Sequence, residues 1–137
     1  MVKLKDIVIL YAEDEVVTNK IFTKKLERIT KNVYSTFNGN EAFEKYLEVK
    51  PDLIITDINM PLMNGGEFIA KVRELDSTTP IIVVTAYAYF GDLDINLIKK
   101  PINFSLFNSI IQSAISSENL PNVTDELKIQ NIYALIH

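Results

Sequence analysis

The sequence predicts an α/β fold: a doubly wound, five-stranded parallel sheet with helices on both faces. Apolar runs alternate about five times with amphipathic helical patterns, and short polar turns separate them. The runs at residues 7–12, 53–56 and 81–84 are continuously apolar, which is typical of strands covered on both faces. The chain has 137 residues, of which 47% are hydrophobic and 23% charged, as in an ordinary globular protein. We expect one folded domain at residues 1–117.

The expected elements follow in chain order. The strands are residues 7–12, 33–37, 53–56, 81–84 and 97–98. Four apolar helical faces accompany them: Val17, Ile21, Phe22 and Leu26; Ala42, Phe43, Tyr46 and Leu47; Phe68, Ile69, Val72 and Leu75; Phe107, Ile110, Ile111 and Ala114. Only 14 residues lie between Thr85 and Lys100, so a fourth helix placed there is shortened. Residues 118–137 form a tail that is either a linker or a short amphipathic helix.

Composition excludes several classes of function. The chain has no cysteine, which excludes thiolate catalysis and cysteine-ligated zinc. Its only histidine is His137. A net charge of −4 and a pI near 5.0 argue against nucleic-acid binding, because phosphate contacts need a basic face. No apolar run approaches the roughly 20 residues of a membrane span. We therefore expect a cytoplasmic protein whose partners are other proteins.

Polar residues follow four of the expected strands. They are Glu13–Asp14–Glu15, Asp57, Thr85–Ala86 and Lys99–Lys100–Pro101. Taken alone, each has an ordinary structural interpretation: an acid after a strand often caps a helix or forms a turn, and a threonine is a common strand residue. In a parallel sheet, however, the carboxyl ends of all strands open on one edge, where ligands bind. Carboxylates, a hydroxyl and an ammonium group would then converge.

Such a convergence favours a cation and phosphoryl chemistry. Clustered carboxylates repel one another unless a hard cation neutralises them, and oxygen-only ligands favour Mg²⁺, with Mn²⁺ as the alternative ion. The Lys100 ammonium suits a phosphoryl oxygen. Together these groups form the electrostatic cradle that phosphoryl transfer requires, with a carboxylate oxygen as nucleophile.

At these residues the sequence resembles the response-regulator receiver family of two-component signalling, whose fold is flavodoxin-like and CheY-like. The matching motifs are Tyr11-Ala12-Glu13-Asp14-Glu15, Thr56-Asp57-Ile58-Asn59-Met60-Pro61 through Asn64-Gly65, Val84-Thr85-Ala86-Tyr87-Ala88, and Lys99-Lys100-Pro101-Ile102. The likeness covers residues 4 to about 117. It implies a signalling switch rather than a turnover enzyme, phosphorylated by a sensor histidine kinase or a histidine phosphotransfer protein, with a homodimer as one output.

The resemblance also implies roles for individual residues. Asp57 is the implied phosphoacceptor. The implied Mg²⁺ ligands are Glu13, Asp14, Asp57 and the backbone carbonyl of Asn59. Thr85 and Lys100 would contact the phosphoryl group, and Ala86, Asn59 and Tyr87 would surround it. The family's switch aromatic is replaced here by Leu97, so the output mode is not implied.

Two alternatives to a receiver also use parts of this pattern. A haloacid-dehalogenase-like phosphatase also uses an aspartate at a strand end with Mg²⁺, but it needs a second acid two residues later, where this chain has Asn59. A flavodoxin-like or degenerate receiver would bind without phosphorylation. A flavin or nucleotide site needs a glycine-rich phosphate loop, which the sequence lacks, and a degenerate receiver would have lost an acid or the lysine.

Overall fold

A computed structural model describes residues 4–57, 60, 62–85, 96–99 and 111. Several predictions concern residues outside these ranges, so they stay predictions. They are the shortened fourth helix, the face around Phe107 and Ala114, and the tail at 118–137.

The described residues form a five-stranded sheet in which every pairing is parallel. The strands are β1 (Val8–Ala12), β2 (Asn32–Thr36), β3 (Leu53–Thr56), β4 (Ile81–Thr85) and β5 (Asn96–Lys99). Their order is β2-β1-β3-β4-β5. The chain therefore adds β2 on one side of β1 and then β3, β4 and β5 on the other side, and the strand order reverses between β1 and β3. The predicted doubly wound parallel sheet is confirmed, and the ligand edge of such a sheet lies at the carboxyl ends of β1 and β3.

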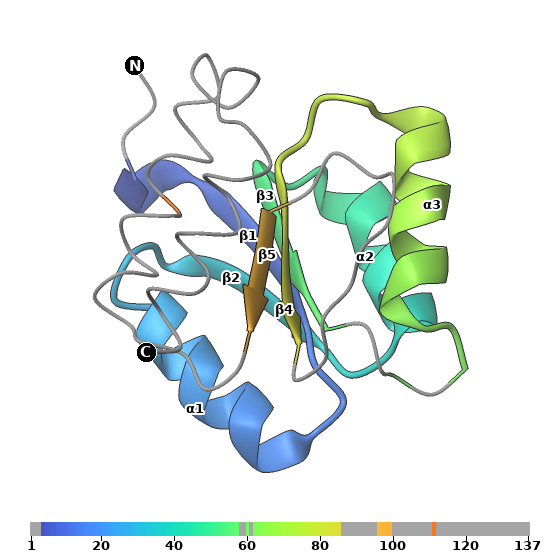
Figure 1. Cartoon of the computed structure of the whole chain (residues 1–137). Helices are drawn as coiled ribbons and strands as arrows, with labels where there is room; N and C mark the ends of the chain where they lie inside the picture. The colour runs from blue at the N-terminus through green and yellow to red at the C-terminus, as the bar shows by residue number, and fades with distance from the viewer. Residues whose placement is uncertain (1–3, 58–59, 61, 86–95, 100–110, 112–137) are drawn as a thin grey trace.

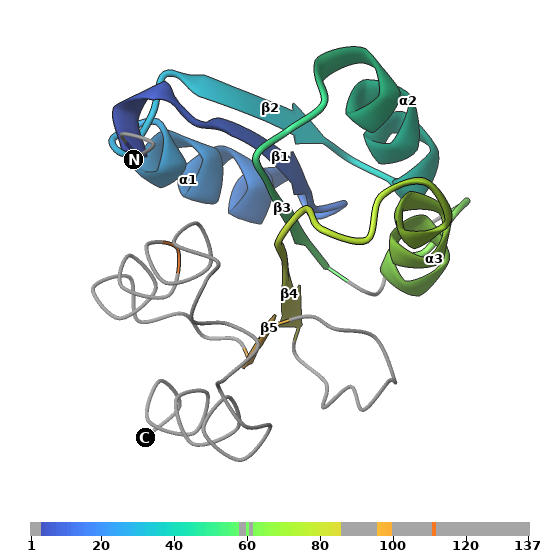
Figure 2. The same cartoon turned by 90° about the horizontal axis from the view of Figure 1, so that it is seen from above.

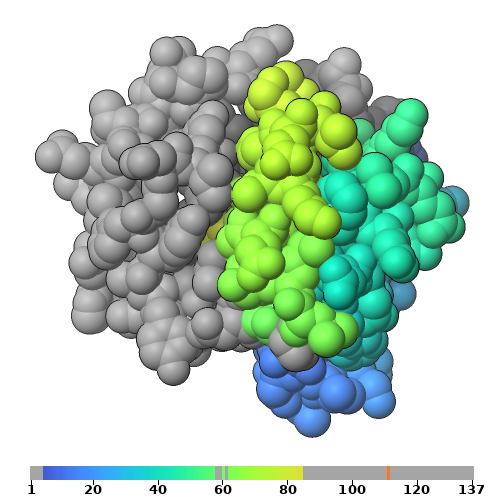
Figure 3. Space-filling view, turned by 90° about the vertical axis from the view of Figure 1, so that its right-hand side faces the viewer, coloured from blue at the N-terminus to red at the C-terminus, as the bar shows by residue number. Residues whose placement is uncertain are grey.

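Three helices and one short turn complete the described architecture: η1 (Leu4–Asp6, a 3₁₀ turn), α1 (Val16–Leu26), α2 (Gly39–Val49) and α3 (Gly65–Leu75). Helix α1 covers one face of the sheet, whereas α2 and α3 cover the other (Figures 1 and 2). Helices α2 and α3 lie side by side, and their side chains form a continuous surface in Figure 3. None of the helices in the described ranges is long and apolar enough to cross a membrane.

Two hydrophobic cores lie on opposite faces of the sheet because successive strand side chains point in opposite directions. The core beneath α1 comprises Ile7, Ile9, Tyr11, Phe22, Leu26, Leu53, Ile55, Ile82, Val84 and Ile111. The core beneath α2 and α3 comprises Leu10, Ala12, Ala42, Tyr46, Ile54, Met60, Met63, Phe68, Ile69, Val72, Ile81 and Val83. The central strands thus contribute to both cores, which explains their uninterrupted apolar sequences.

The predicted buried face of α1 is partly wrong. Phe22 and Leu26 are buried as expected, but Val17 is 62% exposed and Ile21 is 54% exposed. The side chain that joins Phe22 and Leu26 on the buried face is the polar Asn19. At 100° per residue, Val17 lies opposite Leu26 on the helix, so the two cannot share a face.

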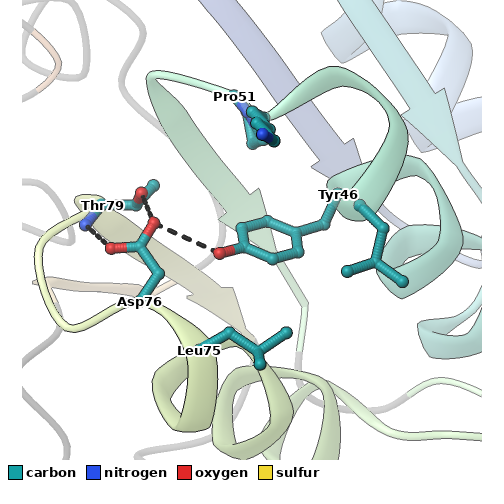
Figure 4. Close-up of a pocket in the computed structure, with 7 residues that line it drawn as sticks. Tyr46, Pro51, Leu75, Asp76 and Thr79 are labelled. Carbon is teal, nitrogen blue, oxygen red and sulfur yellow. Dashed lines mark hydrogen bonds between the residues drawn. The ribbon is translucent and has the colours of Figure 1, made fainter.

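The ends of the other two helical faces also differ from the prediction. Leu47 is 51% exposed on α2, and Leu75 is 62% exposed on α3. Both line an open pocket of about 420 Å³ beside Tyr46 and Asp76 (Figure 4). This pocket lies near the starts of β3 and β4, because Pro51 and Thr79 also line it. It is therefore at the opposite edge of the sheet from the predicted site.

Candidate functional site

Two backbone hydrogen bonds extend the sheet by one residue at the carboxyl end of β1. In the strand register, Ala12 lies beside Thr36 on one side and Thr56 on the other. The next N–H groups continue this pattern: Glu13 N donates to Thr36 O (3.0 Å), and Asp57 N donates to Ala12 O (3.0 Å). Neighbouring parallel strands are about 4.8 Å apart. The sheet therefore holds Glu13 and Asp57 side by side.

Glu13, Asp14 and Asp57 form a cluster of carboxylates at this edge. One carboxylate oxygen from each of the three lies within 4.8 Å of the others. Glu13 is 2% exposed and Asp57 is 7% exposed, whereas Asp14 is open to solvent. A divalent cation would be attracted to such a group of carboxylate oxygens. The structure thus brings together the three acids that the sequence placed at the strand ends.

The acids of the run 13–15 have different local roles. The Glu15 carboxylate caps α1: it accepts a hydrogen bond from Thr18 N (2.9 Å) and another from the Thr18 hydroxyl. Glu13 Oε2 accepts a hydrogen bond from Glu15 N at 3.2 Å, which fixes the turn between β1 and α1. The capping interpretation therefore applies to Glu15, and the cluster uses the two acids before it.

Tyr11, two residues before Glu13 in the sequence, belongs to the core beneath α1. Its ring packs against Phe22, with ring centroids 4.9 Å apart and an interplanar angle of 39°. Burial raises the pKa of the Tyr11 hydroxyl above its usual value, and the negative charges of Glu13 and Asp57 raise it further. The raised pKa keeps the Tyr11 hydroxyl neutral at pH 7.

Asn19 is a structural contributor that the sequence analysis did not identify. Its side-chain Nδ2 donates to Glu13 O (2.9 Å) and to Thr36 O (3.0 Å), and its own Oδ1 accepts from the Thr23 hydroxyl (3.1 Å). It is 1% exposed. The signal in the sequence is a lone amide on the buried stripe of a helix, six residues after Glu13.

The remaining predicted site residues are described only in part. Thr85 ends β4, and its backbone lies beside Lys99 of β5, so it reaches the same edge of the sheet as Asp57. Leu97 lies in β5 beside Val83. The other predicted residues, Asn59, Ala86, Tyr87 and Lys100, lie outside the described residues.

The described donor set fits a small divalent cation. Mg²⁺ binds oxygen ligands at about 2.0–2.1 Å in an octahedron, so ligands on opposite sides of the ion are about 4.2 Å apart, and it usually retains several waters. The three carboxylate oxygens lie within 4.8 Å of one another, which is close to this separation, and backbone hydrogen bonds hold Glu13 and Asp57 in place. Glu13, Asp14 and Asp57 are thus the residues that would hold the ion.

Comparison with known proteins identifies relatives of this chain. Residues 9–112 match the family model of the response regulator receiver domain. The chain is 49% identical over 49 residues to the chemotaxis protein CheY of Thermotoga maritima, a match that covers 36% of this chain and 41% of that protein. It is 29% identical over 92 residues to the regulatory protein AtoC of Escherichia coli, covering 61% of this chain and 20% of that protein. The chain thus matches less than half the length of either relative.

Solved structures agree with this assignment. The response regulator protein TrrA of Thermotoga maritima, solved in complex with Mg(2+)-BeF, has a TM-score of 0.70 and 28% identity, covering 77% of this chain and 96% of that one. The chemotaxis response regulator CheY4 of Vibrio cholerae has a TM-score of 0.71 at 24% identity, covering 79% and 98%, and supports the fold. The matched family model spans most of the chain, reaches from β1 to beyond β5 and includes the acidic cluster, so this protein belongs to the response regulator receiver domain family.

Proposed function

We propose that Asp57 accepts a phosphoryl group in a two-component phosphorelay. One observation carries the proposal: in a chain of the receiver family, the Asp57 carboxylate lies with those of Glu13 and Asp14 at the carboxyl edge of the sheet, within 4.8 Å. The proposed donor is a phosphohistidine on a sensor histidine kinase or a histidine phosphotransfer protein. The proposed setting is the cytoplasm.

The proposed reaction moves the phosphoryl group from the donor imidazole nitrogen to an oxygen of Asp57. An oxygen of the Asp57 carboxylate attacks phosphorus, the P–O bond of an acyl phosphate forms, and the P–N bond to the donor imidazole breaks. The imidazole nitrogen keeps the electron pair of the broken bond and takes up a proton. Asp57 is 7% exposed, and the hydrogen bond from its backbone N–H to Ala12 O fixes the backbone that carries the carboxylate, which would favour a constant geometry for this attack.

The proposal assigns each remaining residue a separate role. A bound Mg²⁺ would supply electrostatic stabilisation for charge on the transferring phosphoryl oxygens. Its proposed ligands are Glu13, Asp14, Asp57 and the backbone carbonyl of Asn59. Thr85 would donate its hydroxyl, and Lys100 its ammonium, to phosphoryl oxygens, while Ala86 and Tyr87 would control access to the group. The complex of TrrA with Mg(2+)-BeF supports the choice of metal.

The proposed consequence of the transfer is a change of surface, since receiver domains are signalling switches. Phosphorylation adds negative charge at an edge that already carries three carboxylates, and this local change would bias the protein between two conformations. The chain would thus assist its own phosphorylation and later hydrolysis without turning over an independent substrate.

Intact mass spectrometry tests the proposed function. The protein is incubated with Mg²⁺ and acetyl phosphate, beside the variants Asp57→Asn and Asp52→Asn. We expect the parent and Asp52→Asn to gain the mass of one phosphoryl group, because Asp52 is an exposed carboxylate before β3 and is not in the cluster. Asp57→Asn should gain nothing, and a chelator should abolish the gain in the parent. Phosphorylation of Asp57→Asn to the parent's extent would refute the assignment.

A further inference from the structure

The first residue of α2 contacts the segment that follows Asp57. Gly39 N donates a hydrogen bond to Met63 O at 2.9 Å, and Gly39 is buried. Met63 belongs to the connection between β3 and α3, six residues after Asp57. The start of α2 therefore holds, through one backbone bond, the segment that leads away from the candidate site.

No side chain fits at this contact. A Cβ on residue 39 would lie 2.1 Å from Met63 O, 2.7 Å from the Met63 carbonyl carbon and 2.7 Å from its Cβ. Two of these atoms belong to the backbone, so rotation of a side chain cannot relieve the overlap. Gly66 differs, because a Cβ there would meet only the Asn64 Oδ1 at 3.3 Å. The close approach of Gly39 to Met63 thus requires glycine.

Leu62, within this connection, has a backbone conformation that it would not favour alone. Leu62 has φ +66°, in the left-handed region that a bulky side chain disfavours, and its side chain is 80% exposed. Its neighbours Met60 and Met63 are each 8% exposed and pack into the core beneath α2 and α3. Packing of the two methionines and the bond from Gly39 therefore maintain the backbone at Leu62.

We propose that Gly39 is a positioning residue for phosphorylation of Asp57: it lets α2 approach the connection closely enough to hold it in the shape that the site requires. This inference rests on the proposed function. The connection joins Asp57 directly to the contact with α2, and it includes Asn59, the proposed carbonyl ligand. We therefore expect a displacement at Met63 to affect the site through this covalent connection.

The variant Gly39→Ala tests the inference, with Gly66→Ala as the matched control. Both add one methyl group in the first turn of a helix, but only the first meets a backbone carbonyl. We expect Gly39→Ala to be phosphorylated by acetyl phosphate roughly 100-fold more slowly and to need more Mg²⁺ for half-maximal rate, because misplacement of about 1 Å has effects of this size. Gly66→Ala should match the parent. Circular dichroism must show that each variant is folded.

Equal rates and Mg²⁺ requirements for Gly39→Ala and the parent would overturn the inference. If the parent itself is not phosphorylated, the proposed function fails instead, so the two failures are distinguishable. If Gly39→Ala does not fold, the parent provides the test through amide hydrogen exchange at Gly39. Coupling between the contact and the site is reciprocal, so Mg²⁺ with beryllofluoride should slow this exchange. An unchanged exchange rate would also overturn the inference.

Discussion

The side chain of Asn19 connects two backbone segments at the acidic edge. Its amide donates to the carbonyls of Glu13 and Thr36, which belong to the ends of neighbouring strands. Both contacts are buried, so the two carbonyls lose these donors if the amide is removed. The backbone position of Glu13 therefore depends on a residue that does not belong to the acidic cluster.

Replacing Asn19 by alanine should destabilise the fold by about 1–3 kcal/mol, the usual cost of leaving buried polar groups without their partners. The free energy of unfolding in urea measures the effect. Asn40→Ala is the matched control, because Asn40 is an exposed residue of α2 and carries the same gain in helix propensity. Equal denaturation midpoints for the two variants would show that the Asn19 contacts contribute no stability.

At this scale the sequence predicted the acids but not their support. Glu13, Asp14 and Asp57 follow apolar strands directly, and parallel strands end on one edge, so their meeting could be inferred from spacing alone. Asn19 could not be inferred in the same way, because a buried amide becomes recognisable only when its acceptors are known. The same is true of Gly39, whose neighbour Met63 is distant in sequence.

Between elements, Asp76 links the end of α3 to α2. Its carboxylate accepts hydrogen bonds from the backbone N–H of Thr78 (2.9 Å) and Thr79 (3.1 Å) and from both threonine hydroxyls. The Tyr46 hydroxyl of α2 donates to the same carboxylate at 3.2 Å (Figure 4). Burial alone would raise the pKa of Asp76, but the hydrogen bonds from Thr79 and Thr78 together lower it below its usual range.

This lowered pKa predicts a specific dependence of stability on pH. The charged form is favoured in the folded state, so the contribution of Asp76 is present above about pH 4 and is lost as the pH falls below that value. Asp76→Asn should lower the free energy of unfolding by about 1 kcal/mol at pH 7 and by less at lower pH. Urea titrations of parent and variant from pH 7 to pH 3 measure this. A difference that stays constant over the range would contradict the prediction.

The strands were predicted more accurately than the buried faces of the helices. The strand at 53–56 has the predicted bounds, because a strand buried on both faces has an unmistakable apolar run. The weaker candidates at 33–37 and 97–98 correspond to β2 and β5. The face of α1 was partly wrong, since Val17 and Ile21 are apolar but exposed. Helical spacing alone places Val17 and Leu26 on opposite sides of α1, but only the structure shows that the side with Leu26 meets the sheet.

In the whole molecule the edge with the acidic cluster lies where the two cores meet the ends of the strands. The core beneath α1 includes Tyr11, and the core beneath α2 and α3 includes Met60 and Met63, so residues close to the acids belong to both. The chain carries a net charge of −4, and two carboxylates of the cluster are buried. A divalent cation at this edge would reduce the repulsion among these carboxylates.

A Mg²⁺ titration followed by amide NMR tests the central claim, that one divalent ion binds among Glu13, Asp14 and Asp57. Asp14→Asn is the informative variant, because Asp14 is exposed and its replacement leaves both cores intact. We predict saturable shifts of the amides of these three residues in the parent, with at least tenfold weaker binding in the variant, about 1.4 kcal/mol. Saturable shifts that centre elsewhere, or none at all at this edge, would contradict the account.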